Sequence, residues 1–174
     1  MLNFPDESTF RAFIKEHQDR VFNMVLKIVQ QVNDAEEITQ DVFVDVYRKP
    51  RAFRGESSVT TWLYRIAMNK SIDHLRRKRK WSLFGSFNET NQPQDFLHPG
   101  VLAENREKAT FLFKAMKKLP DKQHQAWVLS EMENLSYRDI SEIMNVSLSS
   151  VESLLFRARQ NLRKILSGMY PGER

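Results

Sequence analysis

Apolar residues recur every three or four positions along most of this chain, which is the spacing of an α-helix with one buried side. β-branched residues do not alternate with polar ones, and only five glycines are present. The pattern therefore predicts an all-α fold. The residues expected on the buried side of a first helix are Phe10, Phe13, Ile14, Val21, Met24, Val25, Ile28 and Val32.

A second and a third helix follow in the first half of the sequence. The second should begin at Asn33, which heads a capping-box sequence. Lys49 and Pro50 should end it, because proline disfavours helical geometry in the residue before it. The third helix should be capped by Thr60 or Thr61 and should reach about Lys80.

Residues 82–105 differ in composition from the sequence on both sides. They hold proline and glycine among serine, asparagine, glutamine and aspartate, which is typical of a flexible linker. We therefore expect two small helical domains, residues 1–81 and residues 106–174, joined by this linker. The helices expected in the second domain cover about residues 106–119, 121–133, 136–144 and 147–166.

Charge is distributed unevenly along the chain, which carries a net charge of +5. Residues 1–49 have six basic and nine acidic side chains, whereas residues 50–81 have nine basic and two acidic ones. Residues 82–105 have three acidic and no basic side chains, and residues 106–174 have twelve basic and eight acidic ones. This distribution favours one protein contact and two polyanion contacts, although charge runs can also simply solvate a surface.

The third predicted helix has two chemically different faces. The apolar face, expected in the core, consists of Tyr64, Ala67, Met68, Ser71, Ile72 and Leu75. The opposite face, expected to expose an aromatic ring, an amide and several cations, consists of Trp62, Arg65, Ile66, Asn69, Lys70, Asp73, Arg76 and Arg77. Cations neutralise phosphates, and an aromatic ring with an amide can stack on and hydrogen-bond an unpaired base. Ile66 fits this face only if the preceding loop folds over it. The basic run ending at Trp81 leaves open a generic RNA-binding or targeting tract.

Residues 135–147 have the pattern of a helix-turn-helix. Ser136 and Asp139 form a capping pair at the start of the first helix. Asn145 stands where this helix must end, and asparagine tolerates the left-handed geometry of such a turn. Ser147 should cap the next helix. The two caps and the tight spacing favour DNA binding over the alternative, an ordinary helical hairpin.

The helix after this turn should separate a buried seam from a reading face. The residues expected in the seam are Leu148, Val151, Leu155, Ala158 and Leu162. Those expected to face outward are Ser149, Ser150, Glu152, Ser153, Phe156, Arg157 and Gln160. Short polar side chains suit the base edges of a major groove. The cations suited to phosphates are Arg157, Arg159, Arg163 and Lys164.

The composition argues against other classes of function. The chain has no cysteine, which excludes disulfides and zinc–thiolate sites within it. The four histidines lack metal-ligand spacing and no glycine-rich phosphate loop is present, so we expect no metal, cofactor, small-molecule substrate or enzyme activity. No apolar run approaches the ~18 residues that span a bilayer. The first residues lack the pattern of a signal peptide. We therefore expect a cytoplasmic protein without membrane insertion.

Together, these motifs resemble the extracytoplasmic-function (ECF) sigma factors, the compact group of the major bacterial RNA polymerase sigma family. The resemblance covers nearly the whole chain. Its motifs are residues 33–43, Phe53-Arg54-Gly55-Glu56, residues 61–69, Leu119-Pro120, Leu135-Ser136-Tyr137 and Phe156-Arg157-Ala158-Arg159. It implies a sigma factor that binds core RNA polymerase and promoter DNA and that is controlled by an anti-sigma factor.

The resemblance also implies a role for each part. Residues 1–81 would be sigma region 2 and residues 106–174 region 4, with the linker running toward the RNA exit path. The implied polymerase contacts are Glu37, Gln40 and Asp41. The residues implied at the −10 element are Phe53, Arg54, Trp62, Arg65, Asn69, Lys70, Arg76 and Arg77. Those implied at the −35 element are Ser149, Ser150, Glu152, Ser153, Arg157 and Arg159.

The sequence departs from the family pattern at two places in the helix-turn-helix. Ser149-Ser150-Val151-Glu152 stands where the family commonly has Gly-Thr before a basic residue, and Asn145 replaces the usual turn glycine. Glu152 can accept a hydrogen bond from a cytosine amino group, or it can merely favour the dipole of its helix. The rival function is an autonomous helix-turn-helix repressor or activator, which would need neither an acidic docking helix nor a base-reading loop.

Overall fold

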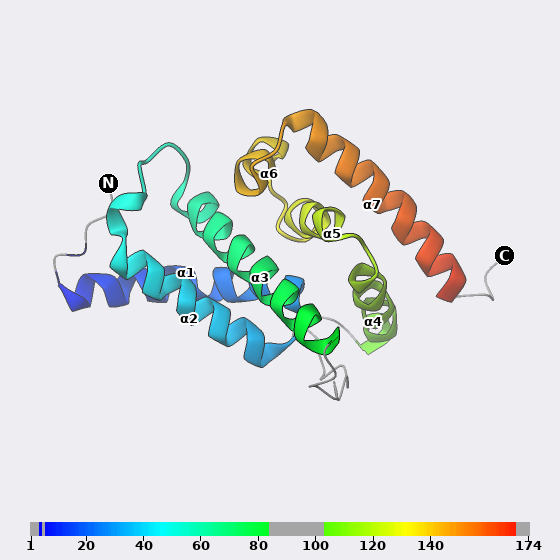
Figure 1. The fold of residues 1–174 in the computed structure, drawn as a ribbon, viewed down its shortest axis with the longest axis horizontal. Coiled ribbons are helices and arrows are strands. Elements are labelled where there is room, and N and C mark those ends of the chain that lie inside the picture. Colours follow the sequence, from blue (N-terminus) through cyan, green and yellow to red (C-terminus); the bar gives the residue numbers. More distant parts are fainter. Residues whose placement is uncertain (1–3, 5, 84–102, 170–174) are drawn as a thin grey trace. The chain divides into compact units, whose positions relative to one another are not determined.

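The computed structural model describes residue 4, residues 6–83 and residues 103–169. Within these residues the chain forms helices and turns but no strand, which confirms the all-α prediction (Figure 1). The chain divides into two compact units. One contains the first three α-helices and the other contains most of the last four, as expected for two small helical domains. None of the described helices is long and apolar enough to cross a membrane.

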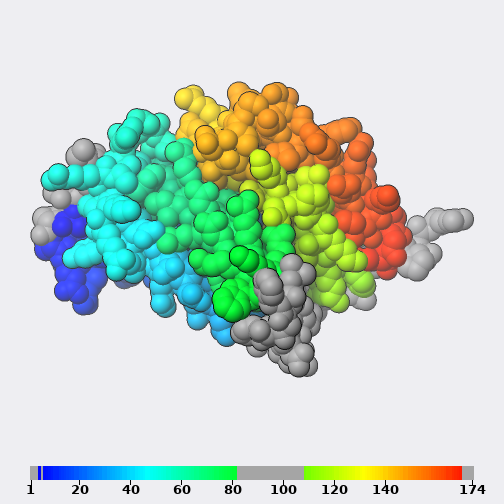
Figure 2. Space-filling view, viewed as in Figure 1, coloured from blue at the N-terminus to red at the C-terminus, as the bar shows by residue number. Residues whose placement is uncertain are grey.

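The first unit is built from α1 (Glu7–Val29), α2 (Val32–Arg48) and α3 (Val59–Leu83). A 3₁₀ turn, Pro50–Ala52, follows α2 and confirms that proline ends this helix. Each of the three helices packs against the other two (Figure 1), and in Figure 2 the side chains of α2 and α3 adjoin on the surface. The fully buried core side chains are Val21, Met24, Val25, Val42, Val46, Leu63 and Met68. Burying one such side chain contributes roughly 1.5–3 kcal/mol, so this core holds the unit together.

The break between α1 and α2 falls earlier than the sequence predicted. Gln30 adopts left-handed geometry, with φ at 54°, and ends α1. Val32 is therefore the first residue of α2 and not the last apolar residue of α1, as we had expected. Gln31 occupies the cap position without a side-chain hydrogen bond, so the predicted capping box at Asn33 is wrong. The left-handed residue is a glutamine, which has no special preference for this geometry, and the sequence therefore gave no signal of the break.

Serine and aspartate side chains cap the other helices of this unit. The backbone N–H of Thr61 donates to the hydroxyl of Ser58 at 3.0 Å, so Ser58 caps α3 in place of the predicted Thr60 or Thr61. At the start of α1, the Asp6 carboxylate accepts from the backbone N–H of Thr9 at 2.8 Å. This hydrogen bond and those from neighbouring hydroxyls lower the pKa of Asp6 to about 2.

The second unit contains α4 (Ala103–Lys117), α5 (Asp121–Trp127), most of α6 (Tyr137–Met144) and α7 (Leu148–Met169). Between α5 and α6 the backbone widens into a π-helical segment, η2 (Val128–Met132). Both α4 and α5 pack against α7. The fully buried side chains include Met116, Leu129, Ile140 and Leu155.

The turn between α6 and α7 has the geometry that the sequence predicted. The backbone N–H of Asp139 donates to the Ser136 hydroxyl at 3.1 Å, and that of Ser150 donates to Ser147 at 3.2 Å. Asn145 is left-handed, with φ at 51° and ψ at 54°. The helix-turn-helix is thus confirmed as a local structure. One seam residue was wrongly assigned, because Leu148 is 52% exposed at the first position of α7.

Candidate nucleic-acid and protein interfaces

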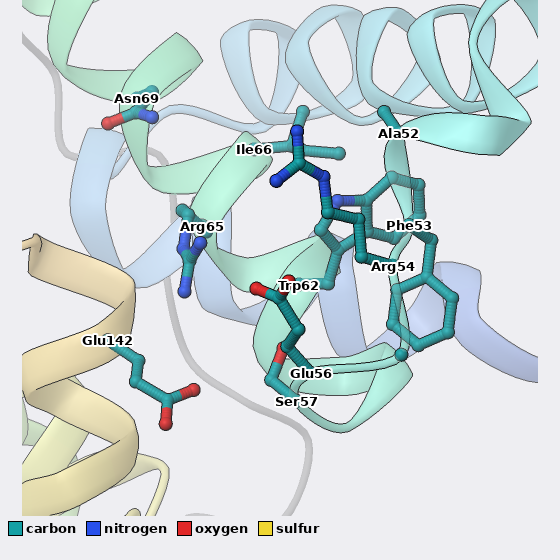
Figure 3. A pocket seen from close by; sticks show the side chains of 11 residues that line it. Ala52, Phe53, Arg54, Glu56, Ser57, Trp62, Arg65, Ile66, Asn69 and Glu142 are labelled. Atoms are coloured by element: carbon teal, nitrogen blue, oxygen red, sulfur yellow. The ribbon is translucent and has the colours of Figure 1, made fainter. Parts of the chain in front are cut away.

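A hollow on the first unit is formed by the loop after α2 and by the start of α3 (Figure 3). Gly55 has φ at +76°, a geometry that favours glycine, and it turns this loop back toward the helix. From these two elements the residues that line the hollow are Ala52, Phe53, Arg54, Gly55, Glu56, Ser57, Trp62, Arg65, Ile66 and Asn69. Four predicted −10 residues of the loop and helix, together with Asn69, are therefore brought to one place.

Trp62 is not the exposed aromatic that the helical pattern predicted. Its side chain is only 9% exposed, and its ring centroid lies 5.3 Å from that of Phe53. The loop folds over this part of α3, so it covers the indole and also half-buries Ile66, which otherwise had no place on a polar face. Trp62 thus supports the loop from below, while Asn69 is exposed one turn beyond Arg65 (Figure 3).

Lys70 is also engaged within the unit. Its ammonium lies 2.8 Å from a carboxylate oxygen of Asp45 and 3.9 Å from one of Asp41. The expected phosphate ligand on α3 therefore pairs with α2, and the expected polymerase contact Asp41 lies beside it. The sequence did not predict this pairing, because Lys70 and Asp45 are far apart along the chain. Arg76 and Arg77, by contrast, are exposed as expected.

A second tie joins the basic end of α3 to the start of α2. The Asp34 carboxylate lies 3.0 Å from the ammonium of Lys78 and 3.2 Å from Nε2 of His74. Lys78 belongs to the basic run that ends at Trp81, whose side chain is 61% exposed. Part of this basic run therefore serves to hold α3 against α2, while the rest faces outward.

The predicted polymerase contacts Glu37, Gln40 and Asp41 are all exposed on α2. Gln40 also borders an apolar groove between α1 and α2. The residues that line this groove are Phe10, Ile14, Gln18, Thr39, Gln40, Phe43, Val44, Tyr47 and Arg48. Val44 is 43% and Tyr47 57% exposed, so apolar side chains of α2 also lie on the surface of the unit. The number of apolar residues on α2 exceeds what one core face needs, and this excess was the signal for a second, exposed apolar surface.

The predicted −35 residues lie along the exposed side of α7. Ser149, Glu152, Ser153 and Arg157 are exposed, and Ser150 is half-buried. The hydroxyl of Ser147 lies 3.1 Å from that of Ser149 and 2.8 Å from that of Ser150, so the first turn of the helix presents linked hydroxyls. Phe156 is 60% exposed on the same helix.

Arg159 differs from the other predicted −35 residues. Its Nη2 lies 2.9 Å from Oε1 of Glu131, a residue of η2. Hydrogen bonds with the side chains of Glu131 and Tyr137 raise the pKa of Arg159. The guanidinium that the sequence assigned to a phosphate is thus bound by groups of its own unit.

No cluster of three or more metal-ligating side chains occurs among the residues that the structure describes.

Comparison with known proteins identifies the family. Residues 13–81 match the model of Sigma-70 region 2, and residues 112–162 match that of Sigma-70 region 4. The ECF RNA polymerase sigma-E factor of Haemophilus influenzae is 32% identical over 163 residues, covering 89% of this chain and 86% of the relative. The ECF RNA polymerase sigma factor SigW of Bacillus subtilis is 30% identical over 170 residues, covering 92% of this chain and 90% of the relative.

A solved structure supports the fold. The sigma factor RpoE of Bartonella quintana, in complex with the anti-sigma factor NepR, matches 91% of this chain and 96% of its own with a TM-score of 0.72 at 22% identity. The chain therefore belongs to the ECF sigma factors of bacterial RNA polymerase. It binds core RNA polymerase and directs promoter recognition at the start of transcription.

Proposed function

We propose that three surfaces divide the work of this sigma factor. The exposed side of α2 docks on core polymerase, the hollow and basic face of α3 bind the −10 element, and the exposed side of α7 reads the −35 element. The proposed domains are residues 1–81 and 106–174. The observation that carries the proposal is that acidic and basic surfaces occupy different helices of one small unit.

The docking surface combines charge with apolar contact. Glu37, Gln40 and Asp41 are exposed at i, i+3 and i+4 positions of α2, and Gln40 adjoins the groove with the exposed rings and methyls of Tyr47 and Val44. Acidic groups at the rim of an interface speed association with a basic partner, while buried apolar contacts slow dissociation. This combination suits a subunit that must find the polymerase and then stay bound.

The −10 surface suits one unpaired base and the phosphates beside it. The hollow has an aromatic floor, formed by Phe53 over Trp62, and Asn69 is exposed at its edge. An amide can pair with a base edge, whereas Arg54, Arg76 and Arg77 can neutralise phosphates without reading sequence. Lys70 contributes to this surface only after it leaves Asp45.

The −35 surface suits the major groove. Short exposed side chains at the start of α7, Ser149 and Ser153, allow close approach to base edges, and Arg157 follows them as a phosphate ligand. The solved sigma factor RpoE of Bartonella quintana, which has this fold, is bound to the anti-sigma factor NepR. We propose that an anti-sigma factor controls this chain in the same way. We further propose that it acts in the cytoplasm and that binding, not catalysis, is its whole activity.

The docking role is tested with Glu37→Ala, Gln40→Ala and Asp41→Ala combined in one protein. This variant should lose most of its affinity for sigma-free core polymerase, because rim charges and the central amide are removed together. Affinity is measured by titration of labelled sigma factor with core, and run-off transcription follows on the same samples. Helix content by circular dichroism should stay unchanged, since all three side chains are exposed.

Glu16→Ala is the matched control for this experiment. Glu16 is an exposed acid on α1 and does not line the groove beside Gln40. It should bind core as the unmodified protein does. If the triple variant binds core with unmodified affinity, the docking role of α2 is wrong. If the unmodified protein binds promoter duplex equally well without core, the rival role of an autonomous regulator is favoured.

A further inference from the structure

One guanidinium connects the two helices of the helix-turn-helix, α6 and α7, with the π-helical segment η2 that precedes them. Arg159 lies in the middle of α7 and its Nη2 is 2.9 Å from Oε1 of Glu131 in η2. The side chain of Tyr137, the first residue of α6, also interacts with this guanidinium and, after Glu131, helps to raise its pKa. A single side chain therefore spans from the recognition helix to both segments that precede it.

The Glu131 carboxylate, which accepts from Arg159, is itself held in place by further hydrogen bonds. The Ser130 hydroxyl donates to Oε1 of Glu131 at 3.2 Å. The backbone N–H of Glu133 donates to the carbonyl of Val128 at 3.0 Å and closes the π turn around Glu131. A π turn widens the helix locally and redirects the side chains it carries. Glu131 is thus positioned to bind Arg159 of α7 in the absence of DNA.

The neighbouring cations of α7 are arranged differently. Arg157 and Arg163 are exposed, and neither forms an ion pair with a carboxylate of a described residue. Nε of Arg157 donates to the carbonyl of Ser153 in its own helix at 3.3 Å, which leaves its charge uncompensated. Within α7, Arg159 is therefore set apart by its carboxylate partner from cations that are available to phosphates.

The geometry points to Arg159 as a positioning residue of the −35 reader and not as a phosphate ligand. Through Glu131 and Tyr137 it fixes how α7 is oriented relative to α6. The orientation of α7 decides which base edges the exposed serines and Glu152 reach. This inference rests on the proposed role of α7 at the −35 element.

The two possible roles of Arg159 predict opposite effects on promoter binding when the carboxylate of Glu131 is removed. If Arg159 positions α7, removing the carboxylate of Glu131 loosens the helix and weakens selection of −35 bases. If Arg159 binds phosphate, removing that carboxylate frees the guanidinium and tightens binding to every promoter. Glu131→Gln keeps the size of the side chain, removes its charge and replaces one acceptor oxygen by an NH2 group, so it separates the two roles.

The experiment uses holoenzyme reconstituted from core polymerase and the full chain carrying Arg159→Gln, Glu131→Gln or both. Preference among randomised −35 sequences and the salt dependence of promoter binding are measured on the same preparations. We expect each single change to relax the −35 preference by about three- to fivefold, the range of a half-exposed ion pair. The double variant should be no worse than either single variant, and the slope of log affinity against log salt should stay unchanged.

Two further variants, Arg163→Gln and Tyr137→Phe, serve as controls for this experiment. Arg163→Gln removes a cation suited to phosphate from the same helix without changing the Arg159–Glu131 ion pair, so it should weaken binding to all promoters alike and leave the −35 preference intact. Tyr137→Phe keeps the ring and removes only the hydroxyl, so it should relax the preference without unfolding the unit, as thermal unfolding would show. These two variants distinguish loss of position from loss of charge or of fold.

Either of two results overturns the positioning role. One is tighter binding of Glu131→Gln to all promoters together with a salt slope that falls by about 0.9 in Arg159→Gln, which is the mark of a lost phosphate contact. The other is an unchanged −35 preference in both single variants while the unmodified holoenzyme shows a clear one. An unmodified holoenzyme without any −35 preference would instead overturn the proposed reading role of α7, and the positioning role with it.

Discussion

At the scale of single residues, α3 of the first unit carries two kinds of polar or aromatic side chain. Some are held within the unit and support its surface, and others are exposed and suited to bind DNA. Trp62 and Lys70 face inward, one beneath Phe53 and the other toward Asp45. Asn69, Arg76 and Arg77 stay exposed on the same helix. Because the supports are fixed by packing and ion pairs, we expect the exposed groups to meet DNA from a defined geometry, which is what discrimination between bases requires.

Asn69 should act at one promoter position only. Asn69→Ala removes an exposed amide beside the hollow, and we expect it to relax preference at a single −10 base by about 1–3 kcal/mol. Arg76→Ala should weaken binding to all promoters alike, because phosphates carry no sequence. Selection from a library randomised over the −10 element measures both effects. An unchanged profile in Asn69→Ala would assign base reading to another residue of the hollow.

Glu152 should read a base rather than serve the helix dipole. It is exposed in the second turn of α7, past the first turn where the dipole acts most strongly. As an acceptor it fits a cytosine amino group. Glu152→Gln should therefore change the −35 sequence that is selected from a randomised library. Under the dipole role, the free energy of unfolding should instead fall by a few tenths of a kcal/mol while the selected −35 sequence stays unchanged.

At the scale of helices, the most sharply defined element is the turn between α6 and α7. Asn145 is left-handed, and its backbone N–H donates to the carbonyl of Ser141. The Ser141 hydroxyl donates to the carbonyl of Val146 at 2.6 Å, so the chain after the turn is also held. The angle at which α7 leaves α6 thus depends on one residue with positive φ.

Asn145→Ala should destabilise the second unit by about 1 kcal/mol, because a Cβ-bearing residue without a short polar side chain resists left-handed geometry. Asn145→Gly should be neutral or stabilising, since glycine adopts this geometry freely. Chemical unfolding monitored by circular dichroism measures the difference between the two variants. Gln160→Ala, an exposed change within α7, is the control, and equal stability of Asn145→Ala and Asn145→Gly would contradict the argument.

The elements that sequence predicted best are those with local physical signals. The helix-turn-helix was predicted correctly because its two serine caps and its left-handed asparagine are all encoded within thirteen residues. The start of α2 was predicted wrongly because the break lies at Gln30, whose type does not favour it. The burial of Trp62 and the pairings of Lys70 and Arg159 could not be predicted, because each depends on a segment distant in sequence that folds over or against the residue.

At the scale of the whole molecule, reading and docking are assigned to two units that each have a core of their own. The core of the first unit includes Met24 and Leu63, and that of the second includes Met116 and Leu129. Since each unit has buried side chains of its own, we expect a change at one reading surface to leave the other undisturbed. Coupling is expected instead within a unit, where Lys70 joins the proposed docking helix to the proposed −10 surface.

The effects of Asn69→Ala and Glu152→Gln on promoter preference should therefore add. Asn69 and Glu152 belong to separate units, so we expect the free-energy changes of the double variant to equal the sum of the single changes within about 0.5 kcal/mol. Holoenzyme carrying either or both changes is assayed on templates that vary at the −10 and −35 elements. Lys70→Ala with Asp45→Ala is the positive control, because their charged groups lie 2.8 Å apart and should show measurable coupling in thermal stability. A coupling above about 1 kcal/mol between Asn69 and Glu152 would mean that the two readers do not act independently when bound to polymerase.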